Sequence, residues 1–579
     1  MPSPVSQREA AVLPREGAFR AGEVGEAGGG RRSWGRRLRG EARPFLVFVL
    51  AWLFLSVSMN ARYPAWRFHD PHRFWFLPSP DVTLLFGGLC VLGRLRRRLP
   101  SWAVGALVGL FLLCRVLRVG DGITGRFYKR TFSIVVDGPL VGELVRLLWS
   151  TTPHGTFALG AAALAGAFVG LALGARAALR YAEGYLARPG GRAAFGGAVA
   201  IFGALSVVAP RPDLPQHRNG AFGTSAVARL THETDFLLHL AGLRQERWRP
   251  LREASARVEA LPAALPGLGG ADVFLFLVES YGHAVVSVPA VREGVEPAWR
   301  RAERELGAAG YAARSSWLEA PTYGGGSWLA QASLASGAKI ADQFAHHLLA
   351  DSGSKSLVWA LRRAGYRAVF ASPAITRRWE HERFFAFDKV YSAPDFGYRG
   401  PAFSWATMPD QFAIDVVHRR EVEGRSGAGP LFLQYALVSS HGPFDVQPPL
   451  VDDWARLGDG SVYHELEPVA FRGLTWANQH EAGGAYARAI AYDVEVLTAY
   501  LTQKAPARAL FVVLGDHQPT PELTGGDPAW TVPVHVISRD PALLAPFERR
   551  GYGPGLTPSG APRPMESLLF TLFESYASG

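Results

Sequence analysis

The spacing of apolar residues divides the chain into two parts that predict different architectures. Long apolar runs dominate the first part, at 44–59, 78–94, 101–117, 155–176 and 192–210. Each run is close to the roughly 20 residues that a helix needs to cross the hydrocarbon core of a bilayer. The pattern therefore predicts a transmembrane domain of about five helices over residues 43–212.

In the second part, short apolar runs alternate with helical patterns. Strand-like runs occupy 272–280, 367–373, 430–442, 509–517 and 532–538, and turn-forming residues bound each of them. Helical periodicity separates these runs, as at 356–365 and 486–503. Alternating strands and helices are typical of a mainly parallel sheet that is covered by helices on both faces. We therefore expect an α/β sandwich domain over residues 265–579.

Two further segments complete the predicted organisation. Residues 1–42 are rich in Gly, Arg, Glu and Ala, a composition typical of a disordered basic tail. Residues 213–264 form a linker, in which positions 226–260 mix apolar and basic residues. This mixture predicts either an amphipathic helix on the membrane surface or an ordinary helix packed against the next domain.

The charge changes sign between the two parts. Residues 1–254 hold 33 Lys and Arg against 16 Asp and Glu, a net charge of +17, and residues 255–579 hold 28 against 34, a net charge of −6. The basic residues accompany the apolar runs, which favours the inner-leaflet bias of membrane loops over nucleic-acid binding. Basic loops fall on one side of the predicted topology, at 31–43, 94–98 and 175–192. With that side in the cytoplasm, the α/β domain lies outside the cytoplasm.

Cysteine use limits the chemistry of the α/β domain. The chain has two cysteines, Cys90 and Cys114, and both lie in apolar runs of the first part. The α/β domain therefore has neither a disulfide framework nor a Cys-ligated zinc site.

Titratable residues stand at the ends of several predicted strands. Glu279, His441 and the pair Asp516–His517 each come at the end of a strand-like run. In open α/β sheets, ligands bind outside the carboxyl ends of the strands, so these side chains can converge on one site. Two carboxylates and an imidazole suit a divalent cation. The arrangement predicts a metal site built by Glu279, Asp516 and His517.

The stretch from Pro321 to Gly337, PTYGGGSWLAQASLASG, places a hydroxyl at the tip of a glycine turn. Glycines let a substrate approach the backbone closely, and the helix that starts at Ser327 would point free N–H groups at an anion. A metal held by the three ligands could bind the Ser327 oxygen, lower its pKa and neutralise charge on a phosphoryl group. Ser327 is therefore the candidate nucleophile.

These motifs occur in a fixed order: a strand followed by Glu279, a Gly–Ser327 helix start, SSHGPF around His441, and GDH at 515–517. In this order they resemble the lipoteichoic acid synthase and phosphoglycerol transferase branch of the sulfatase-like alkaline phosphatase superfamily. The resemblance covers most of the chain beyond residue 44, and it includes membrane helices followed by an extracytoplasmic domain. It implies an alkaline-phosphatase-like fold for the catalytic domain.

The resemblance implies a role for each matching residue. Glu279, Asp516 and His517 match the metal-binding positions of the family. Ser327 matches the nucleophile, which also contacts the metal. His441 matches a substrate-side histidine that could bond the headgroup or steady the leaving oxygen.

Two further implications concern residues outside these motifs. Relatives place polar and aromatic headgroup contacts where Arg377, Arg378 and Trp379 stand in this chain. The better-known relatives use threonine as the nucleophile, whereas this chain has serine. Thr322 is therefore the alternative to Ser327.

Departures from related families bear on the reaction. Sulfatases carry a C/S-x-P-x-R segment, whereas WLAQ follows Ser327, which disfavours the sulfatase reaction. Two-metal relatives carry an Asp-x-x-x-His set, but Ile414 stands four residues after Asp410, which favours one metal ion. His535 could be a late second-site ligand or a packing residue. Phosphoethanolamine transferases commonly carry disulfides in this domain, so its lack of cysteine favours glycerol phosphate.

Together these features predict a membrane-anchored, metal-dependent phosphoglycerol transferase of the cell (inner) membrane. It would move a phosphorylated headgroup from a phospholipid donor to a polyol or glycan acceptor through a covalent serine intermediate. One divalent cation is expected, Mn²⁺ in the first place, with Mg²⁺ or Zn²⁺ as alternatives. The alternative functions are a phosphodiesterase, phosphatase or sulfatase-like hydrolase, a phosphoethanolamine transferase, and a non-catalytic membrane scaffold with a degenerate domain.

Overall fold

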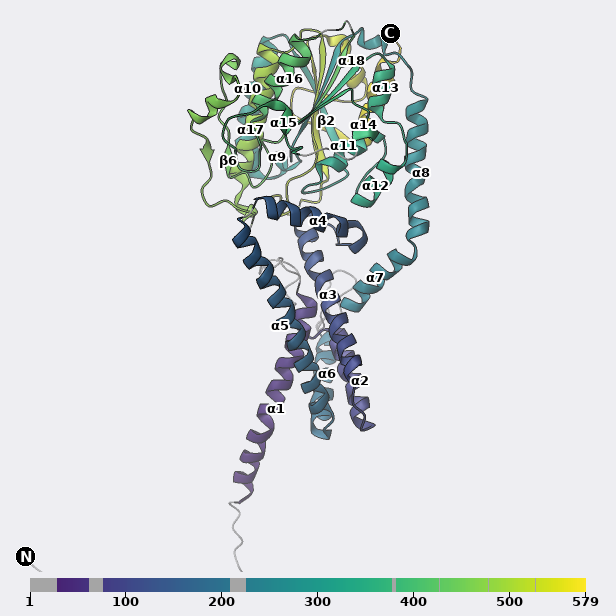
Figure 1. Ribbon diagram of the computed structural model, residues 1–579, viewed down its shortest axis with the longest axis vertical. Coiled ribbons are helices and arrows are strands. Elements are labelled where there is room, and N and C mark those ends of the chain that lie inside the picture. Colours follow the sequence, from purple (N-terminus) through teal and green to yellow (C-terminus); the bar gives the residue numbers. More distant parts are fainter. Residues whose placement is uncertain are drawn as a thin grey trace, which may run out of the picture.

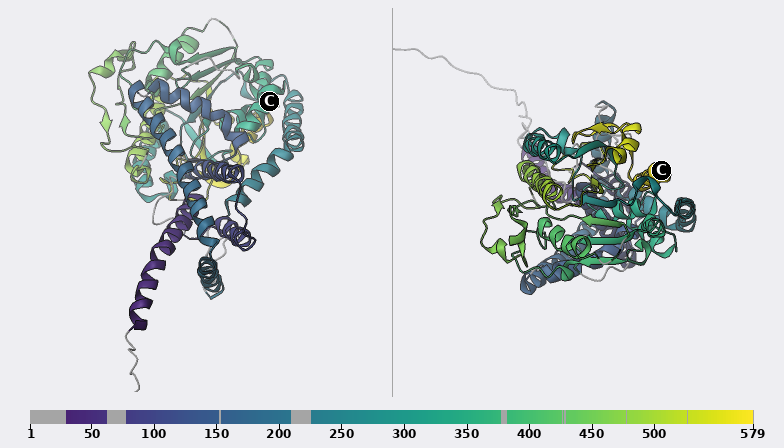
Figure 2. Two further views of the ribbon diagram at one scale, coloured as in Figure 1. Left: turned by 60° about the horizontal axis from the view of Figure 1, so that its bottom comes forward. Right: turned by 90° about the horizontal axis from the view of Figure 1, so that it is seen from above.

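The computed structural model describes residues 29–61, 77–151, 153–208, 225–376, 382–425, 427, 429–476, 478–525 and 527–578. An α/β domain occupies one end of the molecule, and long helices extend from it to the other end, as Figure 1 and the left view of Figure 2 show. The chain enters the α/β domain through α8 (Leu240–Glu259), which runs along one side of that domain (Figure 1).

The five predicted membrane runs all fold as helices. They are α1 (Gly29–Asn60), α2 (Pro80–Arg94), α3 (Ser101–Tyr128), α5 (His154–Leu186) and α6 (Pro189–Val208). Among the described residues, three stretches are long and apolar enough to cross a membrane by length and composition: Ala42–Asn60, Ser101–Tyr128 and His154–Leu186. The expected count of five spans is therefore not confirmed, because α2, for example, has 15 residues and is shorter than a usual bilayer core.

A further helix, α4 (Ile134–Thr151), is not predicted by the sequence pattern. It connects α3 to α5 and lies crosswise between the α/β domain and the bundle of α1, α2, α3, α5 and α6, which we call the anchor (Figure 1). It contacts α12 (Gln343–Asp351) of the α/β domain and leaves Leu144, Leu148 and Trp149 exposed.

The linker forms two helices with different neighbours. α7 (Ala226–Leu238) packs against α3, where Arg229 pairs with Asp121 at 3.2 Å. α8 packs on helices of the α/β domain, and its Leu251 and Ala254 are buried there. For α8, the expectation of an ordinary helix packed against the next domain is therefore confirmed.

The predicted strands join a central sheet, which has nine strands within the described residues. The five predicted strands are β1 (Asp272–Val278), β3 (Arg367–Ser372), β5 (Leu431–Ala436), β8 (Ala509–Gly515) and β9 (Thr531–Ser538). The other four, which the sequence pattern did not predict, are β2 (Ala312–Glu319), β4 (Lys389–Ser392), β10 (Gly553–Pro554) and β11 (Ser559–Pro564). The order is β10–β2–β9–β8–β1–β5–β3–β4, with β11 beside β2. β8, β1, β5, β3 and β4 run parallel, whereas β9 runs antiparallel to both of its neighbours, β8 and β2. The mainly parallel sheet is thus confirmed, and β6 (Val446–Gln447) and β7 (Val469–Ala470) form a separate pair.

Alternate residues of β1 build the core on both faces of the sheet. Phe274 and Phe276 point to one face and pack with α10, α16 and α17, whereas Val273 and Leu275 point to the other and pack with α11, α13, α18 and α19. Burial on both faces explains the continuous apolar run of β1. The helices of the domain are α9 (Ala284–Ser287), α10 (Pro289–Ala308), α11 (Ser327–Ser336), α12, α13 (Leu357–Arg363), α14 (Glu382–Phe385), α15 (Ala393–Phe396), α16 (Asp410–Val417), α17 (Gly483–Gln503), α18 (Pro541–Arg549) and α19 (Leu568–Tyr576).

Three neighbouring strands lead to the predicted site residues. β1 pairs in parallel with β8 through Val278 and Gly515, and with β5 through Leu277 and Ala436. The carboxyl ends of β8, β1 and β5 therefore meet at one edge of the sheet, where ligands bind in folds of this kind.

Candidate active site

Four side chains converge at the carboxyl ends of β1 and β8. Ser327 Oγ donates a hydrogen bond to Glu279 Oε2 at 2.8 Å and lies 3.3 Å from His517 Nε2. His517 Nε2 also lies 3.3 Å from Glu279 Oε1 and 3.7 Å from Asp516 Oδ2. One ligand atom from each of Glu279, Asp516 and His517 lies within 4.8 Å of the others, and all three residues are buried. The structure thus brings together the four residues that the sequence singles out.

The sheet register and three hydrogen bonds fix the carboxylates. Glu279 directly follows β1, and Asp516 directly follows β8. Asp516 Oδ1 accepts from the backbone N–H groups of Ser280 at 2.8 Å and His517 at 2.7 Å. Ser280 has a φ of 59°, a left-handed value that turns the chain after Glu279, and Tyr486 donates to its carbonyl oxygen at 2.7 Å. These contacts orient Asp516 so that its Oδ2 faces the site.

His517 presents one defined nitrogen to the site. Its Nδ1 lies 2.8 Å from the carbonyl oxygen of Gln518, so Nδ1 carries a proton and donates it there. In the neutral imidazole, Nε2 then has its lone pair free on the side of Glu279 and Ser327. A backbone carbonyl on the outer nitrogen is a usual partner of a metal-binding histidine.

The pKa values of the three candidate ligands show that each affects the ionisation of the others. Burial, followed by repulsion from Glu279, raises the pKa of Asp516 to about 7. Burial opposes protonation of His517, but Asp516 and Glu279 outweigh it and raise the pKa of His517 to about 9. Burial would also raise the pKa of Glu279, yet His517 and His441 hold that pKa below its usual value. The carboxylates of Glu279 and Asp516 thus stabilise a positive charge placed beside them and His517.

The donor set fits a divalent cation. Glu279 and Asp516 provide carboxylate oxygens, His517 provides an imidazole nitrogen, and Ser327 adds a hydroxyl beside them. Mixed oxygen and nitrogen donors of this kind are compatible with Mn²⁺ or Zn²⁺, and the carboxylates alone with Mg²⁺.

Ser327 begins α11 directly after three glycines. Gly324, Gly325 and Gly326 have φ values of 72°, 150° and 84°, a region that residues with a side chain rarely adopt. Gly326 is the N-cap, so the Ser327 hydroxyl stands beside the N–H groups of Ser327 and Trp328 that open the helix, whereas the Leu329 N–H donates to the Gly326 carbonyl at 2.8 Å. That helix end favours negative charge at or near the Ser327 oxygen.

The alternative nucleophile, Thr322, has its hydroxyl engaged within the glycine turn. Thr322 Oγ1 donates to the carbonyl oxygen of Gly325 at 2.6 Å, and the residue is buried. Because the hydroxyl closes the turn from within, Ser327 is the better candidate nucleophile.

His441 lies on the segment 437–441 that follows β5, which we call the strap. Ser440 Oγ donates to the backbone carbonyl of Glu279 at 2.7 Å and so ties the strap to the metal ligands. His441 Nδ1 lies 2.7 Å from the carbonyl oxygen of Gly442, so Nδ1 donates there. Nε2 of the half-buried ring is therefore the nitrogen that can act on a substrate.

Sequence reasoning missed two tryptophans beside His441. Trp405 stacks on the His441 ring with centroids 5.2 Å apart, and Trp476 meets it edge-on at 6.2 Å. Their side chains are 42% and 41% exposed, so each presents a free aromatic surface. Both stand outside any helix or strand and far from His441 in the sequence, so no local motif marks them.

The expected headgroup contacts lie outside the described residues: Arg377, Arg378 and Trp379.

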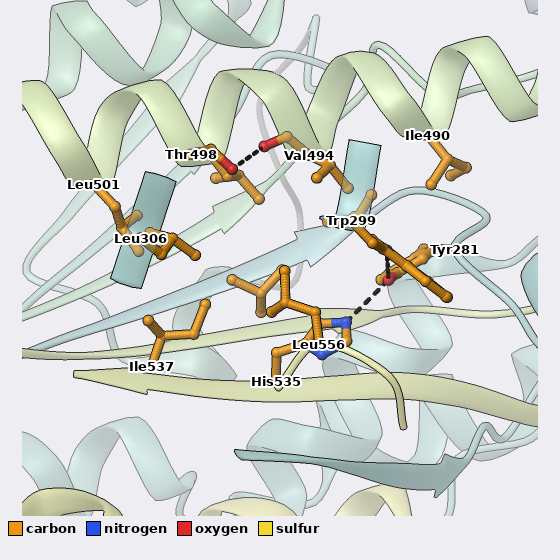
Figure 3. A pocket seen from close by; sticks show the side chains of 13 residues that line it. Tyr281, Trp299, Leu306, Ile490, Val494, Thr498, Leu501, His535, Ile537 and Leu556 are labelled. Atoms are coloured by element: carbon orange, nitrogen blue, oxygen red, sulfur yellow. Dashed lines mark hydrogen bonds between the residues drawn. The ribbon is translucent and has the colours of Figure 1, made fainter. Parts of the chain in front are cut away.

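His535 belongs to a buried chain of hydrogen bonds. Trp299 Nε1 donates to Tyr281 OH at 3.0 Å, and that hydroxyl lies 2.9 Å from His535 Nε2. His535 Nδ1 lies 2.7 Å from Ser315 Oγ, and Figure 3 shows His535 with Tyr281 and Trp299 beside an apolar cavity of about 40 Å³. Both ring nitrogens are engaged, so His535 has the role of a packing residue.

Searches of protein-family models and of curated proteins find no match to the chain. Solved structures similar to it include the lipoteichoic acid synthase LtaP from Listeria monocytogenes, at 14% identity and a TM-score of 0.33, covering 49% of this chain and 70% of that chain. The phosphoglycerol transferase GacH from Streptococcus pyogenes, in complex with sn-glycerol-1-phosphate, is 12% identical with a TM-score of 0.32, covering 58% and 85%. The C-terminal periplasmic domain of EcEptC from Escherichia coli is 14% identical with a TM-score of 0.34, covering 53% and 82%. A lipoteichoic acid synthase and a phosphoglycerol transferase, the two kinds of protein that the motifs resemble, are thus among the structures similar to this chain, while its function must rest on the geometry of the site.

Proposed function

We propose that the protein is a membrane-anchored transferase that moves a phosphorylated headgroup, glycerol phosphate in the first place, from a phospholipid to a hydroxyl acceptor. The observation that carries the proposal is the position of the Ser327 hydroxyl. It stands at the start of α11, 2.8 Å from Glu279 and 3.3 Å from His517, beside a cluster that can hold a divalent cation. A hydroxyl in such surroundings is suited to attack phosphorus.

Ser327 has the role of the nucleophile in the first half of the reaction. Its proton points to Glu279 in the structure, and a cation held by Glu279, Asp516 and His517 would favour the ionised oxygen. The Ser327 oxygen then bonds to the phosphorus of the donor, and the bond from phosphorus to the diacylglycerol oxygen breaks. The N–H groups at the start of α11 face the phosphoryl charge that develops in this step.

His441 is the candidate for giving a proton to the leaving diacylglycerol oxygen and for taking one from the acceptor hydroxyl. Since its Nδ1 donates to the Gly442 carbonyl, Nε2 is the atom that can give a proton to the departing diacylglycerol oxygen. In the second half, the neutral Nε2 takes the proton of the acceptor hydroxyl. The acceptor oxygen bonds to phosphorus, the bond from phosphorus to Ser327 breaks, and the Ser327 oxygen returns to the ionised form from which it attacked.

The anchor supports a donor that resides in the membrane and a site outside the cytoplasm. The basic segments at 94–98 and 175–192, the second of which includes the end of α5, lie together at one end of the helices, where Arg180 donates to the carbonyl of Leu99 at 2.8 Å. The α/β domain lies at the opposite end (Figure 1). Basic loops favour the cytoplasmic side, so we place the α/β domain on the outer side. Anchoring also keeps the site at high effective concentration near lipid headgroups.

A second candidate function replaces the acceptor hydroxyl by water, which gives a phosphodiesterase. Trp405 and Trp476 favour it because both are exposed beside His441, so water can reach this part of the site. The two functions share the first half of the reaction and differ in the compound that receives the headgroup.

The proposal is tested with full-length protein in vesicles that contain headgroup-labelled phosphatidylglycerol, with Mn²⁺ and a soluble polyol. We expect label on the polyol and diacylglycerol in the vesicle, and neither with Ser327→Ala. Label released only as free glycerol phosphate would support the phosphodiesterase. Consumption of phosphatidylethanolamine in place of phosphatidylglycerol would correct the headgroup, and turnover of neither lipid by metal-loaded protein would contradict the proposal.

A further inference from the structure

The three glycines before Ser327 are required for different structural reasons. Gly326 is the N-cap of α11, and a Cβ there would meet only side-chain atoms at 3.2 Å or more. A Cβ at Gly324 would lie 1.7 Å from the backbone oxygen of Phe127, and one at Gly325 would lie 2.9 Å from the ring of Tyr128. The first two glycines therefore make room for another part of the chain.

That other part is the end of the membrane helix α3. Phe127 and Tyr128 are its last two residues, and the backbone of Phe127 lies directly against Gly324. Such close approach of two backbones is a usual reason for glycine. The turn that carries the candidate nucleophile is therefore shaped against a segment from the anchor.

Two basic residues fasten the end of α3 to the loop that follows the metal ligands. Arg126 forms an ion pair with Glu522 at 2.7 Å, in which the two side chains are 14% and 17% exposed. Lys129 Nζ donates to the carbonyl of Asp527 at 2.5 Å. Ion pairs that are largely shielded from water hold geometry better than exposed ones.

The same loop is joined to the glycine turn. Lys129 Nζ lies 4.7 Å from the ring centroid of Tyr323, whose hydroxyl contacts the carbonyl of Asp527 at 3.1 Å. Gly324 N–H donates to the carbonyl of Gln518, the residue after His517, at 2.9 Å. The segment 126–129 therefore contacts both the glycine turn that carries Ser327 and the loop that follows the metal ligand His517.

The end of α3 also reaches the substrate side of the site. The Phe127 ring meets Trp476 edge-on at 6.2 Å, and Trp476 in turn meets His441 at 6.2 Å. Arg126 donates to the backbone carbonyl of Trp476 at 3.3 Å. One short segment of the anchor thus contacts the turn of Ser327 and the aromatic neighbour of His441.

We propose that Arg126–Lys129, at the end of α3, are positioning residues of the active site, which is complete only when this membrane-derived segment is docked. They act through the glycine turn and Trp476, and they do not touch the reacting atoms. The catalytic consequence rests on the proposed function, whereas the docking itself does not. Through this segment, the position of Ser327 depends on the membrane helix α3.

A charge exchange in the full-length protein tests the docking without removing any candidate catalytic group. The variants are Arg126→Glu, Glu522→Arg and the double exchange R126E/E522R. Arg249→Glu makes the same charge change at a side chain that is 72% exposed, and it serves as the matched control. Two measurements are made on each: amide hydrogen exchange of the peptide that covers the glycine turn, and turnover of a water-soluble phosphodiester at saturating Mn²⁺.

We expect each single exchange to raise hydrogen exchange at 323–328 and to lower kcat by about 10- to 100-fold, since small displacements of a nucleophile have effects of that size. KM and bound metal should change little, the double exchange should restore both readouts, and R249E should match the wild type. Unchanged hydrogen exchange in both single variants, or no recovery in the double exchange, would overturn the inference.

The two measurements also separate this inference from the proposed function. If the wild type turns over neither lipid nor soluble diester, yet hydrogen exchange responds to the charge exchange, the docking stands and the proposed function fails. If the wild type is active and both readouts are indifferent to R126E, the proposed function stands and the docking inference fails.

Discussion

The hydroxyl of Ser327 donates a 2.8 Å hydrogen bond to Glu279, although 48 positions separate the two residues. His517, 190 positions further on, contacts the same hydroxyl at 3.3 Å. The parallel register of β1 and β8 fixes the acidic side, and the glycine turn fixes the hydroxyl side. The site needs both the carboxylates and the hydroxyl in place. Substitutions of the metal ligands and substitutions around Ser327 should therefore have different effects.

The first prediction concerns metal binding. Mn²⁺ or Zn²⁺ should stabilise the folded protein, by about 2.7 kcal/mol when the free ion is at 100 times its Kd. Asp516→Ala should abolish both the rise in Tm and the bound metal, because it removes a buried ligand. Asp452→Ala, at an exposed aspartate, is the matched control and should respond like the wild type. Equal metal content in D516A and the wild type would refute the ligand assignment.

The second prediction concerns His441 and the ring stacked on it. His441→Gln should lower kcat by about 10²- to 10⁴-fold, the usual contribution of a proton-transferring group, and leave the metal content unchanged. Trp405→Phe should keep a stacked ring beside His441 and retain most of the activity. Steady-state kinetics on a lipid donor measure both, and full activity of H441Q would remove His441 from the mechanism.

The third prediction concerns a pair of buried carboxyl groups beneath the strap. Asp410 accepts hydrogen bonds from the backbone N–H groups of Val438 at 2.9 Å and Ser439 at 2.6 Å. Burial raises the pKa of Asp410 to about 6, and burial together with Asp410 raises the pKa of Asp493 well above its usual value. Two adjacent buried carboxyl groups cannot both ionise, so we expect Asp493 to hold the proton at neutral pH.

Substitution by asparagine distinguishes the two members of the pair. Asp493→Asn replaces a neutral group by a neutral amide and should be tolerated. Asp410→Asn removes the charge that holds the strap, and it should cost about 2–4 kcal/mol of stability and displace His441. Thermal unfolding and kcat are measured together, and a D493N variant that is as impaired as D410N would contradict this protonation state.

The fourth prediction is a pH dependence that comes from His535. Burial lowers the pKa of His535 to about 3, against about 6.5 in the unfolded chain. Below pH 6.5 the unfolded chain binds a proton that the folded chain does not, so stability falls from pH 6.5 towards pH 3 and gains nothing above pH 6.5. Between pH 6.5 and pH 5 the loss amounts to about 2 kcal/mol.

Replacement of the histidine isolates this contribution. His535→Gln can still accept from Tyr281 and donate to Ser315, and it should show a smaller drop in Tm between pH 7 and pH 5 than the wild type. His464→Gln, at an exposed histidine, should keep the drop of the wild type. Identical pH profiles of H535Q and the wild type would show that the pKa of His535 is the same in the folded and the unfolded chain, which contradicts this prediction.

Much of the α/β domain could be predicted from the sequence because its central strands are buried on both faces. Such strands appear as continuous apolar runs, and the residues that end them are easily found. Glu279 and Asp516 therefore emerged from the sequence together with the parallel sheet. β2 escaped prediction because buried Ser315 and Ser316 interrupt its apolar pattern. α4 escaped because Gly138, Pro139 and Gly142 break its helical periodicity.

The contacts that complete the site could not be predicted, because they join segments without a shared motif. Trp405 reaches His441 from an irregular loop, and Phe127 reaches Gly324 from the end of a membrane helix. The sequence showed three glycines and suggested room for a substrate. In the structure, two of them make room for the protein's own chain, a relationship that depends on how the anchor and the α/β domain pack.

The central claim, that Ser327 becomes covalently attached to the headgroup, is tested most directly by peptide mass spectrometry. Full-length protein is loaded with Mn²⁺, incubated with phosphatidylglycerol and quenched in acid, with Thr322→Val as a parallel sample. The account predicts one glycerol phosphate adduct on Ser327 in both the wild type and T322V, and none in Ser327→Ala. An unmodified Ser327 in protein that continues to turn over its donor, or an adduct that disappears in T322V, would contradict it.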